Sequence, residues 1–275
     1  MNVVVYITSS TNNGQPAVIT ADQPVYAICK SIHWTYPQLY GEDRMVLMMG
    51  GLHIEMAIQN MIGKWLAGSG WTDIFLKAEI ATAGRCESLL KASHVKRTRY
   101  AHEVSLASLF ILRNEAYSAG TEDRSESFES WVSRQCKESV QFLYWQTTLE
   151  LESLLLNFVR SIRVSNFNLF VQMLKEICPW FFALDLTHYS RWLPVFIKPL
   201  EELPLRHPQV YNDFQKGHFT SRKTSATLSA TSGDHLHVQN NRMIKGDGGA
   251  VDILGNETAL LKWMALSRIQ LNQSM

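Results

Sequence analysis

The run RMVLMM at residues 44–49 is followed by Gly50-Gly51 and then by LHIEMAIQNMIGKWLA at residues 52–67. The first run is short and apolar, which predicts a buried strand. In the second run apolar residues recur every three or four positions, which predicts a helix, and Gly68-Ser69-Gly70 marks its end. The glycine pair permits a close backbone approach, and the free N–H groups of the new helix can bind an anion. The stretch predicts a strand-to-helix unit of an α/β protein.

Strand-like and helix-like runs flank this unit. Short β-branched or aromatic runs predict strands at residues 2–8 (NVVVYIT), 17–20 (AVIT) and 180–185 (WFFALD). Helices are expected at residues 24–34, 193–204 and 208–217, and a last helix begins at Asn256 as its N-cap.

The middle of the chain carries helical periodicity without a strand signal, at residues 73–93, 98–118, 123–163 and near 167–178, where Pro179 is expected to end the helix. Residues 123–163 contain no Pro or Gly, so they form either one helix of roughly 60 Å or two helices with an unmarked bend. We therefore expect a mostly helical α/β protein in three parts: residues 1–72, an all-helical insertion at 73–178, and residues 179–275.

The composition narrows the class of protein. Hydrophobic residues make up 46% of the 275 residues and charged residues 19%, which predicts a packed core. The formal net charge is +1, so any nucleic-acid binding must come from a local patch. Four cysteines stand far apart without a CxxC pair, which argues against a zinc ribbon and fits a reducing compartment. With neither a signal peptide nor a membrane span in the sequence, we expect an intracellular protein, nuclear or cytoplasmic.

Acidic and imidazole side chains mark the ends of the expected strands. Asp22 and Asp185 directly follow strand-like runs, where ligands and metals bind in α/β sheets, although such a carboxylate is also an ordinary turn signal. His53 and Glu55 begin the helix after the glycine pair. Two residues apart, they do not share a helix face, and they converge only if the helix begins between them. The alternative is an acidic first turn, which requires Glu55 but not His53.

The run DHLHVQNN at residues 234–241 gathers several hydrogen-bonding groups. On a helix, Asp234, His237 and Asn241 share a face that suits a divalent metal or a polar substrate, but Val238 occupies its middle. Asp234, His235 and His237 could instead bind zinc in a metal-dependent hydrolase, although no matching Cys/His set lies nearby. The GDGG at residues 246–249 is better explained as a helix end followed by a tight turn.

Two basic groups could contact phosphates, the first from Lys91 to His102 and the second from Arg206 to Lys223, with Tyr100 and Phe219 close to them in sequence. A solvated helix face explains the first group equally well. The residues expected to bind nucleic acid are Lys96, Arg97, Arg99, Arg222 and Lys223.

Four segments carry a resemblance: VITADQPVYA (18–27), MGGLHIEMAIQNMIGKWLAGSG (49–70), ALDLTHYSRWLP (183–194) and SGDHLHVQNNRMIKGDGGAVDILGN (232–256). They resemble a family of uncharacterised transposase-like proteins of animal mobile elements, and the architecture is similar to RNase H-like transposases of the hAT type. The resemblance implies a partial RNase H-like sheet interrupted by a large helical insertion. It also implies two-metal phosphoryl transfer, in which carboxylates hold Mg²⁺ or Mn²⁺ ions about 4 Å apart.

The resemblance also assigns roles to individual residues. Asp22 matches the family's DQP segment, and His53 and Glu55 match its GGxHxEM element. In its DxxHEQNN element this chain places Asp234, His237, Gln239 and Asn240. Asp22, Glu55 and Asp234 would then bind metal, Asp22 and Asp234 being the main ligands. His53 and His237 would polarise or orient a phosphate.

Two departures from the family pattern bear on activity. Val238 stands where relatives tend to carry Glu, and valine offers no oxygen to a hard cation. The N-terminal part of the sequence provides at most two strands ahead of the first helix, so we expect only a fragment of the full RNase H-like sheet. We therefore expect a transposase-derived, catalytically inactive protein that binds DNA and can form homo-oligomers. The alternative is a helical protein–protein interaction scaffold without nucleic-acid activity.

Overall fold

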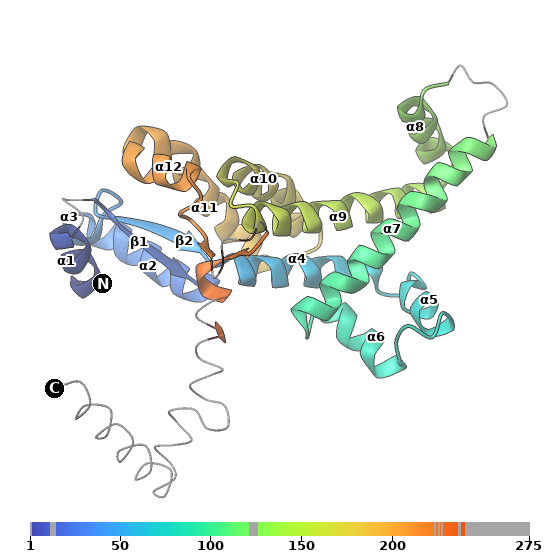
Figure 1. Cartoon of the computed structure of the whole chain (residues 1–275), viewed down its shortest axis with the longest axis horizontal. Coiled ribbons are helices and arrows are strands. Elements are labelled where there is room, and N and C mark those ends of the chain that lie inside the picture. Colours follow the sequence, from blue (N-terminus) through green and yellow to red (C-terminus); the bar gives the residue numbers. More distant parts are fainter. Residues whose placement is uncertain are drawn as a thin grey trace, which may run out of the picture.

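The computed structural model describes residues 2–11, 15–120, 126–222, 224, 226, 228–235 and 238–239. The protein is a mostly helical α/β protein with a small parallel sheet (Figure 1). Strand β1 (Ala17–Ala21) pairs in parallel with β2 (Met45–Met49), so that Ala17 lies opposite Met45 and Ala21 opposite Met49. Helices α2 (Gln23–Thr35) and α3 (Pro37–Tyr40) connect them, as a parallel pair requires.

Helices dominate the rest of the described chain. They are α4 (Gly51–Leu66), α5 (Trp71–Lys77), α6 (Ala83–Leu90), α7 (Val95–Gly120), α8 (Phe128–Glu138), α9 (Val140–Arg163), α10 (Phe167–Ala183), α11 (Thr187–Arg206) and α12 (Pro208–Gln215). Two short antiparallel strands follow, β3 (Ser221–Arg222) and β4 (Ala230–Thr231). Figure 1 shows α7, α8 and the start of α9 extending away from the sheet as an arm.

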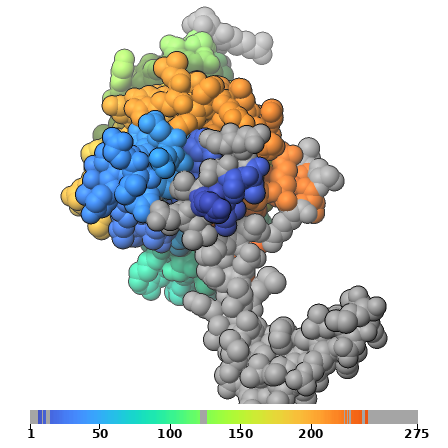
Figure 2. Space-filling view, turned by 90° about the vertical axis from the view of Figure 1, so that its left-hand side faces the viewer, coloured from blue at the N-terminus to red at the C-terminus, as the bar shows by residue number. Residues whose placement is uncertain are grey.

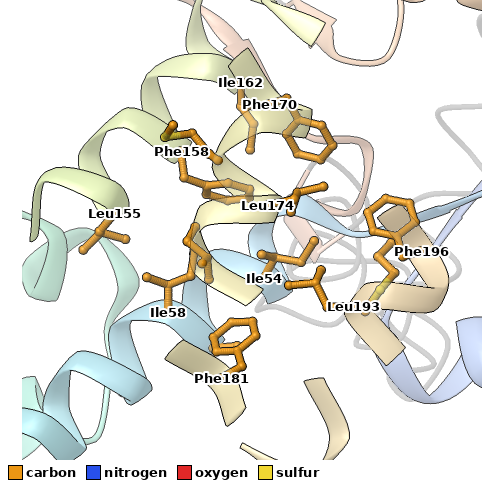
Figure 3. Packing of buried hydrophobic residues seen from close by; sticks show 14 of the residues in the cluster. Ile54, Ile58, Leu155, Phe158, Ile162, Phe170, Leu174, Phe181, Leu193 and Phe196 are labelled. Carbon is orange, nitrogen blue, oxygen red and sulfur yellow. The ribbon is translucent and has the colours of Figure 1, made fainter. Parts of the chain in front are cut away.

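The core lies where α4, α9, α10 and α11 meet. Ile54 and Ile58 of α4 face Phe158 of α9, Leu174 of α10 and Phe196 of α11 (Figure 3). Burying each such side chain stabilises the fold by about 1.5–3 kcal/mol. One hydrophobic cluster therefore draws on all three expected parts of the chain, and the expected boundary at residue 178 falls inside α10.

Most predicted elements are confirmed, including the strands at 17–20 and 44–49 and the helices at 24–34, 52–67 and 208–217. Residues 123–163 contain two helices, α8 and α9, which was one of the two alternatives. The break falls at Ser139, whose hydroxyl accepts a hydrogen bond from the Phe142 backbone N–H at 3.2 Å. A serine cap therefore begins α9 without any Pro or Gly.

The strand predicted at residues 2–8 is wrong. These residues belong to helix α1 (Asn2–Thr11), which lies against β1. Five of the seven residues in NVVVYIT are β-branched, but β-propensity depends on the neighbours that a strand finds rather than on the backbone alone. Among the described residues, β1 has its ladder partner in β2, and the N-terminal segment packs on it as a helix.

The strand predicted at 180–185 and the helix end at Pro179 are also wrong. Helix α10 continues through Pro179 to Ala183. Its buried residues Phe170, Leu174, Ile177 and Phe181 follow helical spacing across the proline, so core burial outweighs the backbone hydrogen bond that the proline cannot make. Helix α11 likewise contains three prolines, and it extends beyond the expected 193–204 at both ends.

The C-terminal helix expected from Asn256 lies outside the described residues. In the described part of the chain, no helix combines the length and the apolar character needed to cross a membrane.

The core predicts a contrast between two Leu→Ala substitutions. Leu174 is fully buried in α10, whereas Leu205 of α11 is 88% exposed. Leu174→Ala should lower the free energy of unfolding by about 2–5 kcal/mol through lost burial and a residual cavity. Leu205→Ala should leave it nearly unchanged. Denaturant unfolding followed by circular dichroism measures both, and equal effects would contradict the described core.

Candidate functional site

Asp234 caps helix α4 from a distant part of the sequence. Gly50 is the N-cap residue and has no side chain to offer. The Leu52 backbone N–H donates to Asp234 Oδ1 and the His53 backbone N–H donates to Oδ2, both at 3.2 Å. A carboxylate at a helix start satisfies unpaired N–H groups and is favoured by the helix dipole. The anion expected at this junction is therefore supplied by the chain itself.

The glycine pair allows this contact. A Cβ on Gly50 would lie 2.2 Å from Asp234 Oδ2. On Gly51 it would lie 2.9 Å from Ile162 Cδ1 and 3.0 Å from Ser232 Cβ. The glycine pair was predicted to permit a close approach, and the segment that approaches it is residues 232–234. Figure 2 shows N-terminal residues in blue and C-terminal residues in orange on the same face of the molecule, and the hydrogen bond from His53 to Asp234 joins these two parts of the sequence.

His53 and Asp234 form a polarised pair. His53 Nδ1 donates to Asp234 Oδ2 at 2.9 Å. This hydrogen bond raises the pKa of His53; burial opposes the shift, and the charges of Asp234 and Asp22 add to it. Burial alone would raise the pKa of Asp234. Hydrogen bonds from His53, Ser232 and the Leu52 and His53 amides outweigh burial and lower it. The geometry favours an imidazolium beside a carboxylate.

A hollow of about 640 Å³ lies beside this pair. Asp22, His53, Asp185, His188 and Tyr189 line it, together with Lys91. The Tyr189 hydroxyl donates to the His53 carbonyl at 3.0 Å. Burial raises the pKa of Tyr189, and the charges of Asp234 and Asp22 raise it further.

Asp22 and Asp185, the two carboxylates that the sequence placed at strand ends, thus face one hollow. Asp185 reaches it from the end of a helix rather than of a strand. Asp22 also caps α2, since Oδ1 accepts from the Val25 backbone N–H at 3.1 Å.

Glu55 does not join His53. Helix α4 begins at Gly51, so both residues lie within it and point in different directions. Glu55 instead accepts hydrogen bonds at 2.6–2.9 Å from Arg99 and from Gln59 Nε2. Burial raises the pKa of Glu55, against the opposing effect of Arg99.

The basic residues fall into different environments. Lys96 and Arg97 are exposed at the start of α7, whereas Arg99 is tied to Glu55. Arg222 is exposed and donates to Ser165 Oγ. Lys223 and His237 lie outside the described residues, as does Asn240, while Val238 and Gln239 are half-buried.

Arg163, a basic residue that lies near His235, was missed by sequence analysis. Burial lowers the pKa of His235, and the positive charges of Arg163, Lys96 and Arg99 lower it further. Arg163 comes from the last turn of α9, where a basic residue is ordinary, so no sequence signal marked it. Arg99 of α7 and Arg163 of α9 line one small hollow with His235, the residue next to Asp234.

The carboxylates expected to bind Mg²⁺ or Mn²⁺ have other partners. Asp234 uses both oxygens on α4 and His53, and Glu55 uses both on Arg99. Among the described residues, no group of three or more His, Cys, Asp or Glu side chains could hold a metal ion. Because hard cations need several oxygen ligands, these residues do not fit a paired-ion centre.

A family model described as a domain of unknown function (DUF8702) matches residues 2–126 and 111–274. The chain belongs to this family. No curated protein and no solved structure matches the chain. The family's description carries no activity, so the resemblance to transposases stays a prediction.

The His53–Asp234 pair predicts a pH-dependent stability. The pKa of His53 is raised in the folded protein. Its contribution to the free energy of unfolding is therefore complete below the unfolded pKa of 6.5 and is lost as the pH rises through the folded pKa. The pKa of Asp234 is lowered in the folded protein. Its contribution to the free energy of unfolding is therefore present above the unfolded pKa of 3.8 and is lost as the pH falls through the folded pKa. The free energy of unfolding of wild type should therefore exceed that of His53→Gln most at about pH 5–6, and the difference should shrink towards alkaline pH.

Urea unfolding across this pH range measures the difference. His188→Gln, an exposed histidine of the same hollow, is the control and should show a smaller pH dependence. A His53→Gln difference that does not change with pH would rule out the polarised pair.

Proposed function

We propose that this chain is a transposase-derived protein, built on a partial RNase H-like sheet, that no longer cleaves nucleic acid and still binds it. The observation that carries the proposal is that Lys96 and Arg97 are exposed at the start of α7, while Arg163 of α9 lines one small hollow with His235, directly beside Asp234. A cationic surface next to an acidic pocket is the arrangement that a nuclease-derived fold needs to hold a phosphate backbone.

The fold supports this origin. Asp22 follows β1 of a parallel pair, and Asp234 returns from the far end of the described chain to the end of β2. The helices from α5 to α9 lie between these elements in sequence. A carboxylate-bearing sheet, a helical insertion and a final acidic residue are the three parts that the resemblance implies.

The site chemistry supports the loss of cleavage. His53 is hydrogen-bonded to Asp234 and shares a hollow with Asp22, and its raised pKa favours a positive charge where a metal ion would otherwise supply one. Glu55 is held by Arg99, and Val238 offers no oxygen one helical turn from Asp234. Two-metal phosphoryl transfer requires ions bridged by free carboxylate oxygens, and these side chains no longer provide them.

Local charge supports binding despite the small net charge. Lys96 and Arg97 of α7 and Arg160 of α9 are exposed, and the half-buried Arg163 follows Arg160 by three residues. Each phosphate neutralised by such a side chain releases a counterion, so binding should weaken steeply with salt.

Substitutions in this patch should weaken binding to nucleic acid. Lys96→Ala and Arg163→Ala should each lower the affinity for a mixed-sequence oligonucleotide, and each should reduce the slope of log K against log salt by about 1. Lys198→Ala, an exposed lysine of α11, is the matched control and should bind like wild type. Fluorescence anisotropy from low to moderate salt gives affinity and slope together.

Absence of binding at any salt, with a stable self-associated species, would favour the scaffold alternative. That alternative draws on an apolar hollow of about 580 Å³ lined by Ile74 (α5), Leu109 and Leu112 (α7), and Phe142 and Trp145 (α9). Its occupant would be a second copy of this chain. Leu112 and Ile74 of this hollow are 60% and 57% exposed, which is apolar area that a second copy would bury.

The loss of catalysis predicts an inactive nuclease. Purified protein with Mg²⁺ or Mn²⁺ should not nick supercoiled plasmid, since the carboxylate oxygens are engaged elsewhere. Val238→Glu should raise the affinity for Mn²⁺ measured by calorimetry, because it adds an oxygen ligand one turn from Asp234. Metal-dependent nicking by wild type that disappears in Asp234→Ala would overturn the inactive assignment.

A further inference from the structure

The start of α7 places an aromatic ring among cations. Tyr100 is 64% exposed, and Lys96 and Arg97 are exposed one turn before it. In the part of the chain that the structure describes, neither cation forms an ion pair and the Tyr100 ring packs on no other ring. A tyrosine exposed to this extent gains little from burial in the fold, and the face of its ring is open to a ligand.

Helix geometry sets the ring between the two charges. With 3.6 residues per turn, Tyr100 lies three residues from Arg97 and four from Lys96, so all three share one side of the helix. Arg99, on the adjacent side, is turned inwards to Glu55. The exposed group is thus separated from the residues that anchor α7.

The helix terminus strengthens the positive potential. The first turn of α7 contains no acidic residue, although the start of a helix favours negative charge and disfavours cations. Lys96 and Arg97 therefore lie where the positive end of the helix dipole adds to their charge. A bound phosphate would compensate both the dipole and the two side-chain charges.

We propose that Lys96, Arg97 and Tyr100 form a platform for single-stranded nucleic acid, in which the cations hold phosphates and the tyrosine ring stacks on an unpaired base. This inference rests on the proposed function and specifies its ligand. Stacking on an exposed ring requires a base whose face is free, which a single strand offers and an intact duplex does not.

The surroundings give the strand a direction. Glu103 is exposed one turn beyond Tyr100 and repels phosphates along the helix axis. Arg99 of α7 and Arg163 of α9 line one small hollow with His235, so the start of α7 lies beside the end of α9. The strand therefore crosses from Tyr100 over Lys96 towards the end of α9, and the platform holds only a few nucleotides.

The test compares a fluorescent twelve-nucleotide single strand with the duplex of the same sequence, using the full chain. Wild type should bind the single strand more tightly. Tyr100→Ala should weaken single-strand binding by about one to two orders of magnitude and leave duplex binding unchanged. Tyr100→Phe keeps the ring and should bind like wild type. Tyr36→Ala removes an exposed tyrosine between α2 and α3 and serves as the control.

The outcomes separate this inference from the proposed function. If Lys96→Ala weakens binding but Tyr100→Ala does not, or if the duplex binds as tightly as the single strand, the platform is overturned and the proposed function stands. If neither oligonucleotide binds wild type, both are overturned. Circular dichroism confirms that each variant is folded, as expected for changes at exposed positions.

Discussion

The carboxylate of Asp234 at the start of α4 is the contact on which the described site depends. It satisfies two backbone N–H groups and orients His53, and the absence of side chains on Gly50 and Gly51 lets it approach. Because α4 also supplies the central apolar residues of the core, this one contact links the end of the described chain to the sheet and to the core together. Both oxygens of this carboxylate accept hydrogen bonds from N–H donors, so its role in the described structure is that of a helix cap.

Two further buried polar pairs fix α7 to the body of the protein. Arg99 is bound to Glu55 of α4, and His102 Nδ1 lies 2.9 Å from Glu152 Oε1 of α9, with both side chains fully buried. Burial raises the pKa of Glu152, against the opposing effect of His102. Breaking such a pair by removing one partner is strongly destabilising, because the other polar group remains buried. These pairs hold the inner side of α7 and thereby present Lys96, Arg97 and Tyr100 outwards.

The basic run from Lys91 to His102 shows where sequence reasoning reaches its limit. Its charges appear as one group in sequence, but the three-residue step from Arg99 to His102 turns both inwards. The inner side of α7 also includes Thr98 and Ser105, which are polar, so hydrophobic periodicity could not distinguish the inner from the outer side. Only the positions of Glu55 and Glu152 on other helices reveal which of these side chains have buried partners.

Local patterns in the sequence determined the two paired strands, the α4 helix with its glycine junction, and Asp22, His53 and Asp234 as residues of interest. These features depend on neighbours within a few positions, where helix and strand periods act directly. Tertiary structure alone decided that residues 2–8 and 180–183 are helical and that Glu55 pairs with Arg99 rather than with His53. It alone also made Asp234 the cap of a helix that begins more than 180 residues earlier. Such outcomes follow from contacts between segments distant in sequence, which override local propensity wherever burial is the larger free-energy contribution.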